Sequence, residues 1–198
     1  MKNTITITMK TLLIGFGINF SHPAMAEPEK VGTSNVAGWD VSAYIDDSSF
    51  SHCTASTTYE ARTEAQRKTS KQAKYTHIGF KVFYDSNWSF YIMSPDWNFD
   101  TERTYSMTIN FMDGSKWGPF EGRPRDEHGI EIVFEAPASF VYQLSALYGM
   151  TIQINGKDAG KFKLTGSAKM TEALLDCAKV GIGMSVSGKG TFDGGTFD

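Results

Sequence analysis

The sequence predicts a mainly β protein, an antiparallel β-sandwich or flattened barrel that carries a C-terminal α-helix. Three observations lead to this fold class. Aromatic residues make up 13% of the 198 residues and 19 are glycine, a mixture typical of strands joined by tight turns. Apolar and polar residues alternate in several short segments, and a helical spacing of apolar residues appears only late in the chain. No internal repeat of 20–50 residues is visible, which argues against solenoids and propellers.

The first 26 residues have the pattern of a secretory signal peptide. Lys2 and Lys10 supply positive charge, residues 11–20 are largely apolar, and residues 24–26 (Ala-Met-Ala) match the small-x-small site that signal peptidase cleaves. The apolar stretch is far shorter than the ~20 residues of a membrane-spanning helix. We therefore expect cleavage after residue 26, a periplasmic or secreted location, and no transmembrane segment.

Two cysteines, Cys53 and Cys177, are the only ones in the chain. An even number of cysteines in an exported protein predicts one disulfide bond. On the chain-entropy view, closing so long a loop is worth about 4–5 kcal/mol of stability. The alternative, a redox-active pair, usually requires cysteines close in sequence, as in Cys-x-x-Cys. We therefore expect a structural disulfide.

The first part of the mature chain alternates between polar and strand-like segments. Residues 27–35 are polar and predict an irregular entry, whereas residues 39–45 and 53–59 show the period-two alternation of strands. Residues 60–74 are rich in cations and poor in apolar side chains, which indicates a solvated loop or a short polar helical turn. A basic binding patch is the alternative interpretation of that segment.

The densest β signal follows in the middle of the chain. Residues 78–84 and 88–92 alternate on either side of a polar turn and predict a hairpin, and residues 105–111 predict another strand. Residues 115–129 are rich in glycine and proline and predict a long loop. Residues 130–134 predict the next strand.

Helical signals appear in the last third of the chain. Residues 138–148 predict a short helix, and Asn155 with Gly156 predicts a tight hairpin turn. A last helix begins near residue 167 and places Cys177 on its apolar stripe, so the disulfide would fasten this helix onto the second strand. We expect Gly181 to end the helix, one β-rich domain over residues 27–180, and a flexible glycine-rich tail over residues 181–198.

This layout resembles the invasion-associated locus B family of small periplasmic bacterial proteins. The matching features are the leader, Trp39 and Cys53 early in the chain, a strand that ends in Asp113-Gly114, and the segment 164–167 before the helix that carries Cys177. The resemblance covers most of the mature chain. It implies a β-sandwich-like periplasmic domain, sometimes tied to host-cell entry, with no established catalytic residues.

The sequence gives no indication of an enzyme or a nucleic-acid-binding protein. The net charge of −3 argues against phosphate binding as the main activity. No G-x-S-x-G nucleophile elbow and no H-E-x-x-H metal motif occurs. The cluster of residues 126–128 (Asp-Glu-His) with Glu131 could supply metal ligands, but a solvated loop is the favoured interpretation. We expect no catalytic residue, no metal and no cofactor.

Three aromatic residues are the best candidates for contact with a partner. Trp97 and Trp117 fall in breaks between the expected strands, and Phe120 lies close to Trp117. Bulky aromatic side chains on a loop are typical of binding surfaces. Our first hypothesis is a non-enzymatic interaction protein that binds another protein through residues 115–129. The alternatives are a carbohydrate-binding module that uses Trp97 and Trp117, and a small hydrolase with an unrecognised site.

Overall fold

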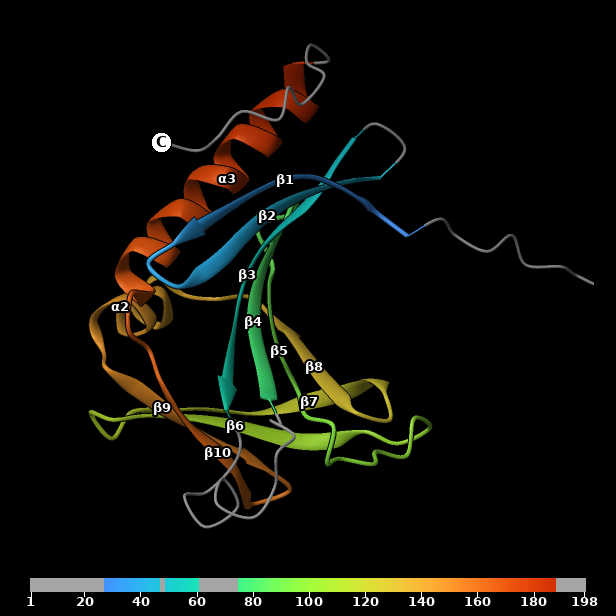
Figure 1. Ribbon diagram of the computed structural model, residues 1–198, viewed down its shortest axis with the longest axis vertical. Coiled ribbons are helices and arrows are strands. Elements are labelled where there is room, and N and C mark those ends of the chain that lie inside the picture. The colour runs from blue at the N-terminus through green and yellow to red at the C-terminus, as the bar shows by residue number, and fades with distance from the viewer. Residues whose placement is uncertain (1–26, 47–48, 61–74, 188–198) are drawn as a thin grey trace, which may run out of the picture.

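The computed structural model describes residues 27–46, 49–60 and 75–187, with side chains described as far as residue 181. The expected signal peptide, nearly all of the charged segment 60–74 and the last residues of the expected tail lie outside these ranges. Figure 1 shows a strongly curved sheet, with helices along one side of it.

The sheet has ten strands, and every neighbouring pair is antiparallel. In space their order is β1-β2-β3-β4-β5-β8-β7-β6-β9-β10, so the sheet is open and the chain first meanders and then crosses over. The predicted fold class is confirmed. The strands are β1 (Glu29–Val36), β2 (Trp39–Asp46), β3 (Ser49–Glu60), β4 (Tyr75–Phe83), β5 (Trp88–Met93), β6 (Tyr105–Phe111), β7 (Lys116–Asp126), β8 (Gly129–Phe134), β9 (Gly149–Ile154) and β10 (Lys157–Lys163).

The predicted loop over residues 115–129 is wrong, because most of it forms β7. The first half of β7 pairs with β6 and the second half pairs with β8, so this strand joins the two parts of the sheet. The register shifts between the pairs Met107–Phe120 and Ile109–Trp117, and Gly118 and Pro119 sit in the resulting irregularity. A bulge accepts a residue that cannot donate a backbone hydrogen bond, which is how a strand contains this proline.

The expected irregular entry over residues 27–35 is also wrong, because residues 29–36 form the edge strand β1. This strand pairs along its length with β2 and has no other strand beside it. An edge strand is held by backbone hydrogen bonds and needs few apolar side chains. Because the sequence of β1 is polar, hydrophobic periodicity does not predict this strand.

Two helices cover the apolar face of the sheet. Helix α2 spans Ala138–Ala146 and buries Phe140 and Leu144, as the spacing predicts. Helix α3 spans Ser167–Ser187 and packs on β2, β3 and β4 (Figure 1). Neither helix has both the length and the apolar character needed to cross a bilayer.

The predicted helix end at Gly181 is wrong, because α3 continues through that residue. Gly181 is buried against Phe50, and a Cβ atom there would lie only 2.2 Å from the Cδ2 atom of that ring. The glycine therefore permits close packing of the helix on β3 and does not act as a stop signal.

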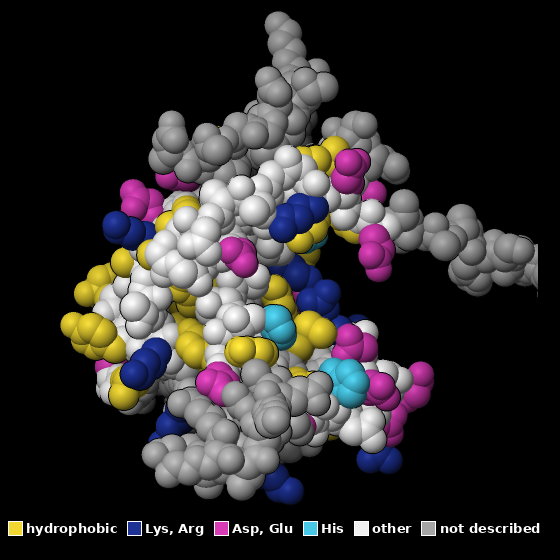
Figure 2. Space-filling view, viewed as in Figure 1, with side chains coloured by type: hydrophobic (Ala, Val, Ile, Leu, Met, Phe, Trp, Pro, Cys, Tyr) yellow, Lys and Arg dark blue, Asp and Glu magenta, His cyan; other side chains and the backbone are white. Residues whose placement is uncertain are grey.

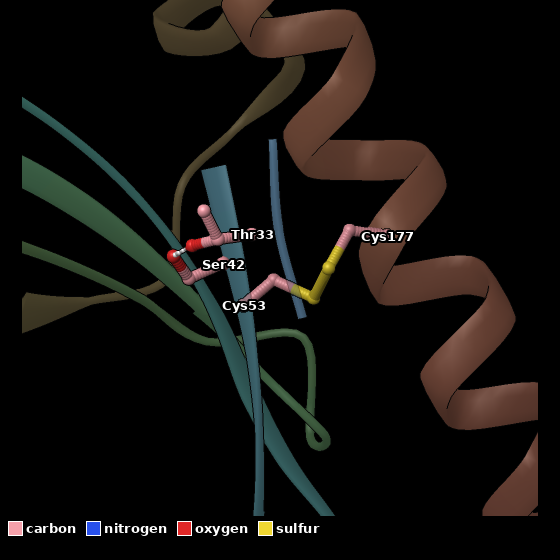
Figure 3. The surroundings of a disulfide bond; sticks show 4 residues. All are labelled: Thr33, Ser42, Cys53 and Cys177. Carbon is pink, nitrogen blue, oxygen red and sulfur yellow. Dashed lines mark hydrogen bonds between the residues drawn. A yellow bond between two sulfur atoms is a disulfide. The ribbon is translucent and has the colours of Figure 1, made fainter. Parts of the chain in front are cut away.

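The predicted disulfide links Cys53 on β3 to Cys177 on α3, and both residues are fully buried. Their Cα atoms lie 6.2 Å apart, within the usual range for a disulfide. Figure 3 shows the two side chains pointing toward each other across the space between sheet and helix, while the hydrogen-bonded hydroxyls of Thr33 and Ser42 lie on the side away from α3. The disulfide thus fastens the helix to the apolar face.

A second contact links β3 to the edge strand β10 across the curved sheet. The phenol of Tyr59, near the end of β3, donates a hydrogen bond to the carbonyl of Lys163 on β10. The ring of Tyr59 also packs edge-on against Phe162, at 5.3 Å between centroids. The curved sheet therefore encloses its core on one face, and its other face remains open.

Candidate functional site

Trp117 and Phe120 lie at the margin of the core and are not exposed loop residues. The indole nitrogen of Trp117 donates a hydrogen bond of 2.5 Å to Oε1 of Gln143 on α2. Its ring meets Phe140 edge-on, at 5.5 Å between centroids. Phe120 packs against Phe134 on β8 with the two rings tilted by 33°, at 5.0 Å between centroids. Both side chains are half-buried, so each has a structural role as well as an exposed edge.

Three large apolar side chains on α2, on the β6–β7 turn and on the segment after α2 are far more exposed than Trp117. We call Met112, Tyr142 and Tyr148 the aromatic corner; their exposed fractions are 76%, 70% and 87%. They lie where α2, the β6–β7 turn and the segment between α2 and β9 meet. Figure 2 shows hydrophobic side chains gathered on this margin, at the left of the view. Exposed apolar side chains that lie together often mark an interaction surface.

The elements of the aromatic corner are fixed to one another by hydrogen bonds. The amide of Met112 donates to the carbonyl of Gly149, at 3.2 Å. Gln143 accepts from the Trp117 indole and donates to Oδ2 of Asp113, at 3.4 Å, which ties α2 to the β6–β7 turn. Hydrogen bonds from Ser115 lower the pKa of the Asp113 carboxyl, which keeps it ionised as an acceptor.

The sequence contains a partial signal for this surface. Tyr142 falls off the Phe140–Leu144 stripe of its helix, so its position outside the core follows from helical periodicity. Tyr148 and Met112 carry no such signal, because the pairing of β6 with β9, which are distant in sequence, brings their segments together.

Trp97 lies at a different place from Trp117. Trp97 packs near Phe99 and Tyr105, at one end of β6, whereas Trp117 pairs with Ile109 toward the other end of that strand. The two tryptophans therefore do not form one platform. Trp97 instead lines a groove of about 380 Å³, whose polar margin is formed by Asp96, Asn98, Lys157 and Asp158.

The open face of the sheet carries a group of charged and aromatic residues that the sequence analysis missed. Glu131 on β8 forms an ion pair with Lys81 on β4, at 2.8 Å, and a longer one with Arg125 on β7, at 3.6 Å. Ser89 also donates a hydrogen bond to this carboxylate. Both cations lie over the ring of Tyr91, at 5.5 Å for Lys81 and 5.0 Å for Arg125. We call this group the cationic cleft.

His52 extends this group toward β2. Its ring stacks on Tyr44 at 4.7 Å, and its Nδ1 atom lies 2.9 Å from the Ser51 hydroxyl. Burial, and then the charge of Lys81, lower the pKa of His52 from 6.5 to about 4. Such an imidazole is too weak a base for efficient proton transfer near neutral pH, and no carboxylate of the described residues hydrogen-bonds to it. The Ser51–His52 pair thus lacks the features of a hydrolase dyad.

The cluster around residue 128 is divided by the fold. Oδ1 of Asp126 accepts a hydrogen bond from the backbone of His128, whose ring nitrogen contacts the carbonyl of Trp97 at 2.8 Å. Glu131 instead faces Lys81 and Arg125. Within the described ranges, no group of three or more His, Cys, Asp or Glu side chains could hold a metal ion.

Comparisons with known proteins bear on the fold alone. The sequence matches no protein-family model and no curated protein. The structure is similar to the crystal structure of invasion associated protein B from Bartonella henselae, with a TM-score of 0.52 and 13% sequence identity. The match covers 75% of this chain and 98% of that chain. The two proteins share a β architecture at this level of similarity.

Proposed function

We propose that this chain is a non-enzymatic interaction protein of the bacterial periplasm or cell surface, and that it binds a protein partner through the aromatic corner. The observation that carries the proposal is the exposure of the large side chains of Met112, Tyr142 and Tyr148. Tyrosine, tryptophan and methionine are enriched in the buried centres of protein interfaces. Covering these side chains would remove a large apolar area from water.

The rigidity of the corner supports the same function. Hydrogen bonds link Trp117, Gln143 and Asp113, so α2 and the β6–β7 turn already hold their relative positions. A surface that is formed before binding loses little conformational entropy when a partner docks. In this proposal Trp117 contributes its exposed edge to the interface, and Phe120 supports the strand beneath it.

A site-specific crosslinking experiment in cells tests this proposal. A photoreactive phenylalanine analogue replaces Tyr148, and in a matched control it replaces Tyr84, which is 65% exposed but lies on the β4–β5 turn. We expect a discrete crosslinked protein from position 148, and none from position 84. Equal crosslinking at both positions, or none at either, would contradict a partner site at the corner.

The proposed location and family have separate support. The leader pattern, the buried Cys53–Cys177 disulfide and the fold shared with invasion associated protein B all agree with an exported protein of the invasion-associated locus B type. Fractionation of the native cells, with the N-terminus of the mature protein sequenced, tests the location. A periplasmic or secreted protein that begins at residue 27 is the expected result, and a cytoplasmic protein with an intact N-terminus would contradict it.

Carbohydrate binding is a second candidate, and the groove beside Trp97 favours it. An aromatic side chain flanked by Asp96, Asn98, Lys157 and Asp158 offers both a hydrophobic face and hydrogen-bonding groups to a sugar ring. A glycan array that compares the unmodified protein with Trp97→Ala tests this candidate. Binding that is lost in Trp97→Ala and retained in Trp117→Phe supports it, and the absence of any binding to the array excludes it.

A further inference from the structure

The cationic cleft is an unusual arrangement for the open face of a sheet. Side chains on such a face normally reach water, yet only 14% of Lys81 and 17% of Glu131 is exposed. Figure 2 shows the molecule hollowed on this side, with Lys and Arg side chains inside the hollow. The hollow continues as a cleft of about 630 Å³, lined by Glu121, Arg123, Pro124, Arg125, Glu131 and Val133. This volume is typical of a small-molecule site.

The carboxylate of Glu131 is fully engaged inside the cleft. One of its oxygens faces Lys81 and Ser89, and the other faces Arg125. Removing such a buried pair from water costs free energy, so the pair by itself is weak evidence of a stabilising role. A cleft with a few convergent charged groups is a typical place for a small ligand to bind.

Arg125 has hydrogen-bonding capacity that the described residues do not use. Its Nε atom is 3.6 Å from Glu131, too long for a hydrogen bond, and no described residue accepts one from its guanidinium. The Cζ atom of Arg125 lies over the ring of Tyr91, 5.0 Å from its centroid, which holds the guanidinium at the cleft. A guanidinium whose terminal donors are not used by the described residues is suited to bind a carboxylate or phosphate group with two parallel hydrogen bonds.

The charges around the cleft favour an anion. Lys81, Arg123 and Arg125 contribute three positive charges, and the carboxylates of Glu121 and Glu131 contribute two negative charges. The nearby His52 is uncharged at neutral pH, because burial and Lys81 lower its pKa to about 4. A net positive charge therefore remains beside the unused donors.

We propose that the cationic cleft binds a small organic anion, with its carboxylate or phosphate group on Arg125 and its apolar body against Val133 and Pro124. Val133 is 60% exposed on the strand next to β7, and Pro124 lies in the same lining. The acid group supplies the charge that the cleft lacks, and the exposed valine supplies an apolar surface for the rest of the molecule.

Amide chemical shifts of the isotope-labelled protein test the proposal. The probes are benzoate and phenyl phosphate, which share an apolar ring with the neutral control benzyl alcohol. We expect saturable shifts centred on residues 123–125 and 131–133 with at least one anion, at a Kd on the order of millimolar. A response to only one anion identifies the acid group. Equal shifts with benzyl alcohol, or no shifts up to ~50 mM of either anion, would overturn the proposal.

A charge-removing variant makes the test specific. Arg125→Gln should weaken anion binding about tenfold, because a charge-assisted hydrogen bond is lost. Arg103→Gln is the matched control, since Arg103 is an exposed arginine that pairs with Asp100 at 2.9 Å. Unchanged affinity in a folded Arg125→Gln protein would overturn the assignment. If the Arg125→Gln variant does not fold, the salt dependence of binding to the unmodified protein replaces this test. We then expect the affinity for the anions to fall as the salt concentration rises. An affinity that does not change with salt would overturn the proposal.

Discussion

At the scale of single residues, burial separates the aromatic side chains that stabilise the protein from those that are free to bind. Trp117 donates to Gln143 and packs on Phe140, whereas Tyr148 is 87% exposed. Replacing the two residues should therefore have different consequences. Each replacement therefore reports on a different property, one on folding and the other on recognition.

We expect Trp117→Ala to lower the free energy of unfolding by about 2–4 kcal/mol, because it removes ring packing and one hydrogen bond. Trp117→Phe retains the packing and should cost about 1 kcal/mol. Tyr148→Ala should change the unfolding free energy by less than about 0.5 kcal/mol. Urea unfolding of the three variants measures these differences. A loss for Tyr148→Ala as large as that for Trp117→Ala would contradict the separation of roles.

A second residue-scale prediction concerns His52 and pH. The pKa of His52 is about 4 in the folded protein and near 6.5 when unfolded. Between these values the unfolded chain binds more protons, so stability is fully present above pH 6.5 and falls as the pH drops toward 4. His52→Phe keeps the stack on Tyr44 and should flatten this part of the pH profile.

Urea unfolding at a series of pH values between 4 and 7 checks this prediction. His77→Phe, at the exposed end of β4, is the matched control and should leave the slope as it is. An identical slope for the unmodified protein and His52→Phe would show that another group causes the pH dependence.

At the scale of helices and strands, the close packing of α3 on β3 depends on the absence of a side chain at Gly181. Alanine in place of a mid-helix glycine normally stabilises a helix by about 1 kcal/mol. Gly181 should behave in the opposite way, because its added Cβ would meet the ring of Phe50. We expect Gly181→Ala to lower the melting temperature.

A double variant separates the two effects. In a Phe50→Ala background the clash is absent, so Gly181→Ala should become neutral or stabilising. Thermal unfolding of the four proteins measures the coupling between the two positions. A stabilising effect of Gly181→Ala in the unmodified background would contradict the close packing described here.

The elements that the sequence predicted correctly are those with a buried apolar face. Residues 39–45 and 105–111 alternate because one side of β2 and of β6 contacts the core. The polar edge strand β1 and the bulged strand β7 lack that alternation, so hydrophobic periodicity misses both.

The same limit applies to the candidate site. The glycine- and proline-rich surroundings of Trp117 and Phe120 predicted an exposed loop, whereas both residues lie half-buried on β7, against neighbours on α2 and β8 that are distant in sequence. The cationic cleft requires β4, β5, β8 and β7 to lie side by side in that order. Strand order is a long-range property, and spacing along the chain does not contain it.

At the scale of the whole molecule, a few long-range links hold the curved sheet and the C-terminal helix together. The Cys53–Cys177 disulfide joins β3 to α3, Tyr59 joins β3 to β10, and the Trp39 indole donates to the carbonyl of Thr165 at 3.0 Å. The disulfide is the covalent one of these three links, and its two cysteines are 124 residues apart in the sequence.

We expect the double variant Cys53→Ala/Cys177→Ala to lose about 4–5 kcal/mol of unfolding free energy, because the unfolded chain regains the freedom that the cross-link removes. Chemical denaturation of the oxidised protein and of the variant measures the difference. Equal stability would mean that α3 is held by packing alone.

The most direct test of the account is the oxidation state of Cys53 and Cys177 in the native cell. The disulfide is the covalent link between α3 and the sheet, and it is expected to form only if the protein is exported to an oxidising compartment. Thiols are blocked in intact cells, and the protein is digested without reduction and analysed by mass spectrometry. We expect one peptide pair linked through Cys53 and Cys177, with neither cysteine blocked. Recovery of both cysteines carrying the blocking group would contradict both the disulfide between β3 and α3 and the proposed location.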